Sequence, residues 1–206
     1  MLIVTALVMA VIVKTFLVQA FYIPSGSMEP TMLVNDRILV QKVSYWNSDV
    51  KRGDIVVFDD PSNWLDAEES RQPHNIVQRT LETFGLFPTG GHLIKRVIGV
   101  GGDHVKCCDS TGHLEVNGVS LEEPYVLDQS LTRERTFDVV VPKNHLWVMG
   151  DNRGNSADSR AHMGEAGGGF VPEANVVGKA WVRVWPWNRA GFIKYPDTFD
   201  ALNKKK

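Results

Sequence analysis

The pattern of hydrophobic and polar residues divides the chain into two parts. Residues 2–13 are apolar apart from Thr5, and more apolar residues follow Lys14 as far as Ile23. Beyond Pro24 the apolar residues occur in short runs, which Gly, Asn, Asp and Pro interrupt. Such runs are typical of β-strands joined by turns. The sequence therefore predicts an apolar N-terminal segment followed by a mostly β domain with few helices.

The N-terminal segment reaches the thickness of a membrane only when it is counted through Ile23. As a helix, residues 2–13 would measure about 18 Å and residues 2–23 about 33 Å, whereas a hydrocarbon core is about 30 Å thick. The longer helix requires Lys14 to extend its ammonium group to the outer interface. We predict one transmembrane helix, an anchor over residues 1–23.

Other interpretations of this segment stay open. Val18-Gln-Ala20 has the small-residue pattern of a cleavage site, so the segment could be a secretory signal that is removed. The absence of a basic region before the apolar run favours the retained anchor. The segment could also be a buried helix of a soluble protein, or an anchor of which part lies upstream of Met1.

Several apolar runs after Pro24 are predicted to be strands of one core. They are rich in β-branched residues and are bounded by turn-forming residues. The dipeptide Asn117-Gly118 suits a type I′ turn and predicts a hairpin over residues 114–119. The core strands are expected at residues 37–43, 55–58, 92–98, 145–149 and 176–184.

These elements predict an antiparallel-sheet core with an inserted β-hairpin lobe. The lobe covers residues 103–141, and the core takes the two flanking parts, 24–102 and 142–190. Residues 191–206 are expected to be a C-terminal tail. Within the polar stretch 59–91, residues 75–84 could form a short helix, but the sequence assigns the stretch no role.

Charge and cysteine content narrow the possible functions only slightly. A formal charge of -2 and a pI near 6.3 give no reason to expect nucleic-acid binding. Cys107 and Cys108 are adjacent, so they cannot close the usual loop, and either a free pair or some disulfide is compatible with the sequence. No metal site is predicted, because the histidines show no ligand spacing around these cysteines.

The candidate nucleophile is Ser27, in Pro24-Ser-Gly-Ser-Met-Glu-Pro-Thr31, directly after the apolar segment. A serine is a poor nucleophile unless other residues supply a base and donors for the developing oxyanion. Lys95 is the candidate base, although an ordinary lysine with a pKa of about 10.4 is neutral in only about 0.04% of molecules at pH 7. Burial without a carboxylate partner would favour the neutral amine, and lowering the pKa by about three units corresponds to about 4 kcal/mol.

Strand alternation limits which side chains of the 92–98 run can be buried. It places Lys95 on the opposite face from Ile94 and Arg96, so we expect one of Lys95 and Arg96 to face inward. Arg96 cannot lose its proton at working pH and is expected to be structural or to face the substrate. Taken alone, the strand would also fit a lysine exposed on the surface.

Four segments in this order, following an apolar anchor, resemble bacterial type I signal peptidases, the Ser/Lys endopeptidases of protein export. They are Ser25-Gly-Ser-Met-Glu-Pro30, Arg52-Gly-Asp-Ile-Val-Val-Phe58, Lys95-Arg96 and Gly150-Asp-Asn-Arg-Gly-Asn-Ser-Ala-Asp-Ser-Arg160. The resemblance covers about the whole chain. It implies a membrane-bound serine endopeptidase that cleaves signal peptides after Ala-x-Ala, with Ser27 as nucleophile and neutral Lys95 as general base.

The resemblance also implies roles for residues around this pair. Ser156 would orient the Lys95 amine, and the Ser25 hydroxyl would join the Ser27 N–H in binding the oxyanion. Asp158 and Arg160 would form a supporting ion pair, and Asp151 and Arg153 would brace their loop. Small apolar subsites would be lined by Ile23, Pro24, Met28, Leu33, Leu93 and Ile94.

The partners and location follow from the same resemblance. The expected partners are preprotein signal peptides and membrane lipid, near the protein export machinery, with no cofactor and no metal. The expected location is the bacterial cytoplasmic membrane, with the catalytic domain on its outer face. Glu29, where many relatives carry an uncharged residue, and the long 59–91 stretch depart from the pattern.

Other functional classes fit the sequence less well. A Ser-His-Asp hydrolase lacks its Gly-x-Ser-x-Gly turn here, and Pro30 occupies the lysine position of an SxxK site. A self-cleaving repressor-type Ser/Lys protease would share the chemistry but not the apolar N-terminus. A membrane-tethered β-domain that binds extended peptides by strand addition would not need Lys95.

Overall fold

The structure is a computed structural model, and it describes Thr5, residues 17–65 and residues 91–204 of the 206-residue chain. Within this part of the chain, no helix is both long and apolar enough to cross a membrane. Most of the predicted anchor and the predicted helix over residues 75–84 lie outside the described residues.

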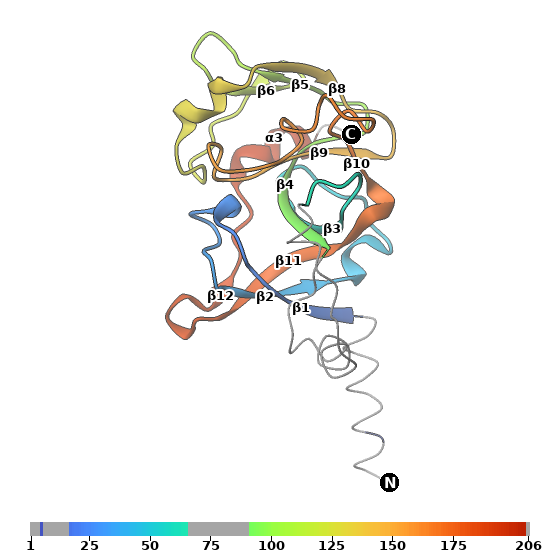
Figure 1. The fold of residues 1–206 in the computed structure, drawn as a ribbon, viewed down its shortest axis with the longest axis vertical. Helices are drawn as coiled ribbons and strands as arrows, with labels where there is room; N and C mark the ends of the chain where they lie inside the picture. Colours follow the sequence, from blue (N-terminus) through green and yellow to red (C-terminus); the bar gives the residue numbers. More distant parts are fainter. Residues whose placement is uncertain (1–4, 6–16, 66–90, 205–206) are drawn as a thin grey trace.

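Most of the described strands form one antiparallel sheet of eight strands. Its order is β1-β2-β11-β3-β4-β9-β10, and β12 pairs with β11 (Figure 1). The strands are β1 (Val18–Tyr22), β2 (Arg37–Gln41), β3 (Ile55–Asp59), β4 (His92–Val100), β9 (His145–Met149), β10 (Val171–Pro172), β11 (Val176–Trp185) and β12 (Gly191–Phe192).

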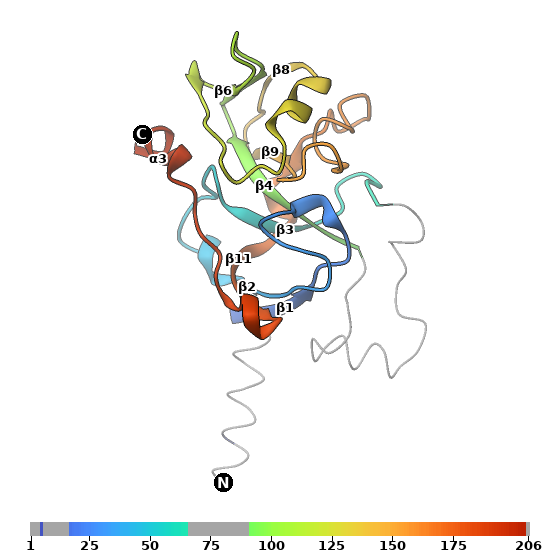
Figure 2. The same cartoon turned by 90° about the vertical axis from the view of Figure 1, so that its left-hand side faces the viewer.

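A second antiparallel sheet lies at one end of the molecule, beyond β4 and β9 (Figure 2). It has the order β7-β6-β5-β8. Its strands are β5 (His104–Cys107), β6 (Leu114–Val116), β7 (Val119–Ser120) and β8 (Phe137–Val140). The opposite end of the molecule is formed by β1, β2 and β12 (Figure 1).

The remaining described elements are short. They are the 3-10 turns η2 (Gly26–Met28), η3 (Val43–Tyr45), η4 (Gln129–Glu134), η5 (Glu173–Asn175), η6 (Trp187–Arg189) and η7 (Asp197–Phe199), and the helix α3 (Asp200–Lys204).

The central strand β3 explains why β4 is held firmly. Its apolar residues alternate between two hydrophobic clusters: Ile55 and Val57 pack in one, Val56 and Phe58 in the other. Side chains of successive strand residues point to opposite faces, so this all-apolar run is typical of a strand buried on both sides. Burial on both sides of β3 fixes the neighbouring strand β4, which carries the candidate base.

The prediction of a mostly β, antiparallel fold is confirmed. Each predicted core strand overlaps a strand of the eight-stranded sheet. The predicted hairpin is also present, with Asn117 and Gly118 at φ 51° and 78°, as a type I′ turn requires.

The predicted anchor is wrong at its C-terminal end. Residues Val18–Tyr22 form β1, which pairs with β2 along its whole length, and Phe21 and Ile23 are buried in the core. Within the domain these residues have backbone hydrogen-bond partners on β2 and an apolar environment. They would lose both if they formed part of a membrane helix. Cleavage after Ala20 would cut through this strand, which argues against the removable-signal alternative.

The two sheets share one hydrophobic core. Val105, Leu114 and Phe137 from the second sheet pack with Trp147 and Met149 of β9. Cys107 and Cys108, whose state the sequence leaves open, are bonded to each other in a disulfide at the edge of this core.

The C-terminal segment packs on the same core instead of extending as a tail. Phe199 and Leu202 belong to the cluster that contains Trp147 and Met149. Arg52 donates a hydrogen bond to the Leu202 carbonyl (3.2 Å) and pairs with Asp103 (2.5 Å). This contact joins the C-terminal residues to both the core and the start of the lobe.

Candidate active site

The structure brings Ser27 and Lys95 into direct contact. Ser27 lies in the turn η2, which follows β1, and Lys95 lies in the middle of β4. The Lys95 Nζ lies 2.8 Å from the Ser27 Oγ, and the two residues are only 4% and 7% exposed. A hydroxyl and an amine that are both withdrawn from water can therefore exchange a proton directly.

Backbone hydrogen bonds fix the turn that carries Ser27 to the 150–160 loop. The Asn152 N–H donates to the Ser27 carbonyl (3.1 Å), and the Asn152 Nδ2 donates to the Gly26 carbonyl (3.0 Å). Thr31, after the turn, donates through Oγ1 to the Asp151 carboxylate (2.6 Å). Sequence reasoning missed Asn152 and Thr31, although both lie within the quoted motifs.

The expectation that only one of Lys95 and Arg96 faces inward is wrong, because both are buried. Arg96 donates two hydrogen bonds to Asp151 (2.8 and 2.6 Å) and one to the Gly53 carbonyl (3.0 Å). Its guanidinium also lies over the Tyr125 ring, 4.1 Å from the ring centroid. Burial lowers the pKa of Arg96, but the charge and hydrogen bonds of Asp151 outweigh it and raise the pKa. Arg96 is therefore structural, and Asp151 binds both to it and to Thr31.

The predicted ion pair between Asp158 and Arg160 is present. Arg160 donates to both carboxylate oxygens of Asp158, at 2.9 and 2.8 Å, and the Gly150 N–H donates to the same carboxylate (3.0 Å). Burial raises the pKa of Asp158, but the hydrogen bond and charge of Arg160, the Gly150 N–H and the charge of Lys95 together lower it. The charges of Asp158 and Lys95 therefore interact, so the burial of Lys95 is not free of a carboxylate.

Ser156 does not make the hydrogen bond that was predicted for it. Its Oγ is buried and has no hydrogen-bond partner. The hydroxyl is packed tightly instead, because a Cβ added to Gly150 would lie only 2.3 Å from it. The Lys95 amine is held by Ser27, without Ser156 as a hydrogen-bond partner.

Arg153 braces the loop through a residue that the sequence did not indicate. It donates to both carboxylate oxygens of Glu123, at 2.8 and 2.7 Å, and to the Gly150 carbonyl (3.0 Å). Glu123 lies outside every quoted motif, in the segment between β7 and η4. No local pattern marks it, since an acidic residue between turns is usually solvated.

The residues proposed to bind the oxyanion and the substrate occupy different environments. Ser25 and Pro24 are exposed, and the Ser25 side chain makes no capping hydrogen bond at the start of η2. Ile23 and Met28 are buried in one cluster, against which Ile94 packs. Leu93 belongs to the other cluster, and Leu33 is 37% exposed, so the structure does not gather the six predicted pocket residues into one group.

The described residues contain no group of three or more His, Cys, Asp or Glu side chains that could hold a metal ion.

Comparison with known proteins identifies the class to which this site belongs. The family model described as "Signal peptidase, peptidase S26" matches residues 1–185. Signal peptidase I of Mycobacterium tuberculosis is 40% identical over 93% of this chain and 73% of its own length, and the probable signal peptidase I of Mycobacterium leprae is 39% identical over 88% and 73%. A crystal structure of a signal peptidase I from Enterococcus faecalis V583 aligns with a TM-score of 0.40 at 28% identity, over 64% of this chain and 97% of that chain.

The family model and the curated relatives define the chain as a peptidase, and hence a hydrolase. The chain belongs to the signal peptidase I family, peptidase family S26, and its activity is the cleavage of signal peptides from preproteins.

We predict that Arg96→Ala destabilises the protein by about 3–5 kcal/mol, because it leaves the buried carboxylate of Asp151 without its partner. Chemical denaturation measures the loss. Arg37→Ala is the control, since Arg37 is an exposed arginine of β2. Equal stability of the two variants would contradict a structural role for Arg96.

We predict that the stabilisation from Asp158 depends on pH. The lowered pKa means that the folded state is favoured above the ordinary aspartate value of about 3.9, and that this gain disappears as the pH falls through the lowered value. Wild type should exceed Asp158→Asn in stability by about 3–5 kcal/mol near pH 7. The difference should narrow below about pH 4. Urea denaturation of wild type and Asp158→Asn, from pH 7 to below about pH 4, measures this difference in the free energy of unfolding, with the exposed Asp197→Asn as control. A difference between wild type and Asp158→Asn that stays constant with pH would refute the prediction.

Proposed function

We propose that the chain is a membrane-bound endopeptidase in which Ser27 is the nucleophile and Lys95, as a neutral amine, is the general base. The observation that carries this proposal is the buried 2.8 Å contact between the Lys95 Nζ and the Ser27 Oγ. This distance is within the reach that proton transfer from a nucleophile to its base requires.

The proposed reaction proceeds in two stages. The Ser27 oxygen bonds to the scissile carbonyl carbon while its proton passes to the Lys95 nitrogen, and the resulting ammonium then protonates the departing amine. A water molecule next gives a proton to Lys95 and attacks the acyl ester, and Lys95 returns that proton to the departing Ser27 oxygen, which releases the signal peptide and restores both residues. The products are the mature protein and the signal peptide, and no oxidant or cofactor is consumed.

The electrostatics around Lys95 support its role as a base. Burial disfavours the charged ammonium form. Asp158 acts in the opposite direction, but its carboxylate oxygens are already engaged by two hydrogen bonds from Arg160 and one from Gly150. This engagement reduces the negative field that Lys95 experiences, and so limits the stabilisation of the ammonium.

Oxyanion binding is assigned to the Ser27 N–H and the Ser25 hydroxyl. Both lie in or next to η2, and the Ser25 hydroxyl is not used as a helix cap. Gly26, between them, does not adopt a positive φ, so the turn alone does not require glycine there. Close approach of the substrate backbone accounts for it better.

Specificity for small residues, as in Ala-x-Ala, is supported by apolar packing next to the nucleophile. Met28 follows Ser27 directly and is buried with Ile23, and Ile94 packs against the same cluster. Filled space of this kind leaves little volume for a substrate side chain larger than alanine. Pro24 is exposed beside this cluster and is assigned to the substrate-facing side.

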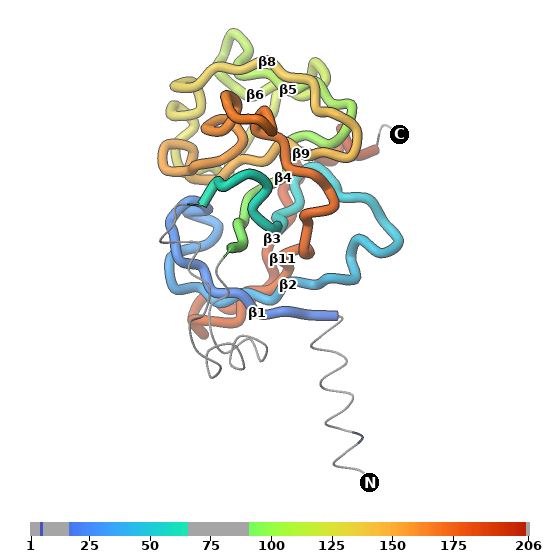
Figure 3. The backbone as a smooth tube through the Cα atoms, turned by 45° about the vertical axis from the view of Figure 1, so that its right-hand side comes forward, coloured from blue at the N-terminus to red at the C-terminus, as the bar shows by residue number. Residues whose placement is uncertain are grey.

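A location at the outer face of the bacterial cytoplasmic membrane is supported by the end of the molecule that carries β1. Trp185, Trp187 and Phe192 are exposed there, at 44%, 78% and 76%. Figure 3 shows β1, β2 and β11 side by side at this end, and Figure 1 shows β12, which pairs with β11, next to β2. Aromatic side chains gather at membrane interfaces, so this surface would contact lipid while preproteins arrive from the export machinery.

We predict that cleavage of a preprotein with an Ala-x-Ala site is abolished in Ser27→Ala and falls by about 10²–10⁴-fold in Lys95→Ala, the usual contribution of a general base. Ser110→Ala and Lys51→Ala, at exposed positions, should keep activity close to that of wild type. The assay is the rate of signal-peptide release in detergent micelles. Substantial activity in Lys95→Ala would eliminate the proposed base and favour a peptide-binding or different catalytic mechanism.

We predict that the Trp187 side chain contacts lipid. In vesicles of phosphatidylethanolamine and phosphatidylglycerol with brominated acyl chains, tryptophan fluorescence of the full chain should be quenched, and less so in Trp187→Phe. Trp147→Phe is the control, because Trp147 is buried and should contribute no quenchable signal. Quenching that is unchanged by Trp187→Phe would show that this surface does not face the bilayer.

A further inference from the structure

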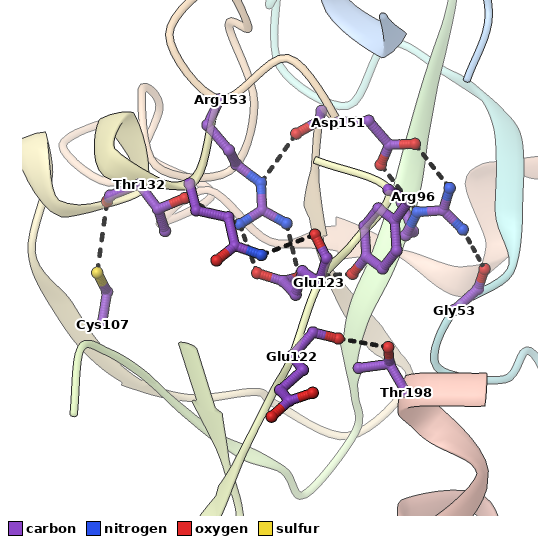
Figure 4. A network of polar contacts seen from close by, with 12 residues as sticks. Gly53, Arg96, Cys107, Glu122, Glu123, Thr132, Asp151, Arg153 and Thr198 are labelled. Carbon is purple, nitrogen blue, oxygen red and sulfur yellow. Dashed lines mark hydrogen bonds and ion pairs between the residues drawn. The ribbon is translucent and has the colours of Figure 1, made fainter. Parts of the chain in front are cut away.

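Glu123 reaches the candidate active site from the segment between β7 and η4, outside the motifs of the family. Its side chain is buried and forms a two-point ion pair with Arg153, at 2.8 and 2.7 Å. Tyr125 donates a further hydrogen bond to the same carboxylate. Figure 4 shows Glu123 and Arg153 facing one another, with Glu122 directed away.

Arg153 connects Glu123 to the backbone of the 150–160 loop. Its Nε donates to the Gly150 carbonyl (3.0 Å), and its Nη1 donates to the Thr132 hydroxyl (3.2 Å). Burial lowers the pKa of Arg153, but the charge and hydrogen bonds of Glu123 outweigh it and raise the pKa. The guanidinium is thus fixed in place by Glu123 on one side and holds a loop carbonyl on the other.

Gly150 packs closely against the residue that carries the nucleophile. A Cβ added there would lie 2.4 Å from the Ser27 carbonyl oxygen and 2.3 Å from the Ser156 Oγ. Its N–H is held by Asp158 at 3.0 Å and its carbonyl by Arg153. Because both polar groups and the α-carbon of Gly150 are constrained, a displacement of Arg153 would move Gly150 against Ser27.

The segment that contains Glu123 is itself attached to the loop. The Leu127 N–H donates to the Asp151 carbonyl (3.1 Å), and the Gln129 side chain donates to the Glu123 carbonyl (2.9 Å). The segment and the loop are therefore joined by a backbone hydrogen bond, and the Glu123 carboxylate adds a charged contact between them.

We infer that Glu123 is a positioning residue for the cleavage reaction, acting through Arg153 and the Gly150 carbonyl to hold Ser27 in line with Lys95. This inference rests on the proposed roles of Ser27 and Lys95. It assigns to the lobe a part in the reaction in addition to its share of the hydrophobic core. Misplacement of reacting groups by about 1 Å can lower the rate by about 10²-fold. A residue that does not touch the substrate, such as Glu123, can therefore affect the rate of cleavage through the position of Ser27.

The test compares Glu123→Gln and Glu123→Asp with the matched control Glu122→Gln. Glu122 is the adjacent residue, carries the same charge and is exposed. Signal-peptide release should show kcat reduced by about 10–100-fold in Glu123→Gln. Glu123→Asp should lie between this variant and wild type, Glu122→Gln should match wild type, and KM should be nearly unchanged in all three.

The pH profile distinguishes positioning from a loss of charge. Loosening of the loop admits water to the base, which favours its ammonium form, so the acidic limb of kcat/KM should move to higher pH. Loss of the Glu123 charge alone would move it to lower pH. Glu123→Asp keeps the charge, so a shift to higher pH in this variant isolates the positioning effect.

Rates are measured at a temperature at which circular dichroism shows each variant fully folded. A variant with a lower melting temperature but wild-type kcat and pH profile under these conditions would overturn the inference and leave Glu123 a purely structural residue. If neither Glu123→Gln nor Glu123→Asp folds, Thr132→Val provides the test of the inference. This substitution removes one hydrogen bond from Arg153 and leaves the Glu123–Arg153 ion pair in place. A kcat unchanged by Thr132→Val would then count against the inference.

Ser27→Ala and Lys95→Ala are assayed alongside. If these two variants remain active, the proposed function fails, whatever Glu123 does. If they are inactive and the Glu123 variants behave as wild type, only the positioning role fails.

Discussion

A lysine buried beside a serine is costly to keep in its charged form, and the arrangement of charges around Lys95 follows from this cost. Three buried arginines lie in β4 and the 150–160 loop, and each has its own buried acid: Arg96 with Asp151, Arg153 with Glu123, and Arg160 with Asp158. Removing one partner from a buried ion pair is strongly destabilising, so every charge must be matched. Each of these carboxylates lies against its own arginine, and the charge of Lys95 lowers the pKa of Asp158 while that carboxylate is paired with Arg160.

The same charge pairs connect the parts of the fold. Two of the pairs join segments that are distant in the sequence. The third, Asp158 with Arg160, lies near the end of the 150–160 loop, and its carboxylate also accepts a hydrogen bond from the Gly150 N–H at the start of that loop. Arg96 in β4 reaches Asp151, and Glu123 of the lobe reaches Arg153. The lobe and the sheet also share a hydrophobic cluster, which includes Phe199 from the C-terminal segment. The site therefore lies where the two sheets are bound together, and its geometry depends on both.

The sequence predicted those features whose signal is local or carried by a motif. The β3 run and the Asn117-Gly118 turn follow from short-range patterns, the Asp158–Arg160 pair follows from the family resemblance, and the structure contains each of them. The contact between Ser27 and Lys95 could be anticipated only from the order of the motifs, because nothing in either segment specifies the other. Glu123 could not be predicted, since its importance depends on a partner on a loop that it meets only in the folded chain.

The errors about β4 and about the N-terminal segment each have a physical cause. Strand alternation assumes that one face of a strand is exposed to water, but β4 is buried at successive residues from Lys95 onward, so Lys95 and Arg96 are both buried, each with a polar partner. Likewise, an apolar run before Pro24 fits a membrane helix or a buried strand equally well, and pairing with β2 decides for the strand in Val18–Tyr22.

The strand β1 also fixes where the nucleophile lies relative to the N-terminal segment. A flexible linker before Ser27 would let the site move with respect to anything that precedes it. Instead, β1 is paired along its length with β2, and Phe21 and Ile23 are buried before the chain enters η2. The Ile23 N–H and carbonyl are both hydrogen-bonded within the domain, to the Asp36 carbonyl and the Asn35 N–H. The distance from Leu17 to Ser27 is therefore set by folded structure, and a membrane-bound segment ending at β1 would place the scissile bond at a fixed depth.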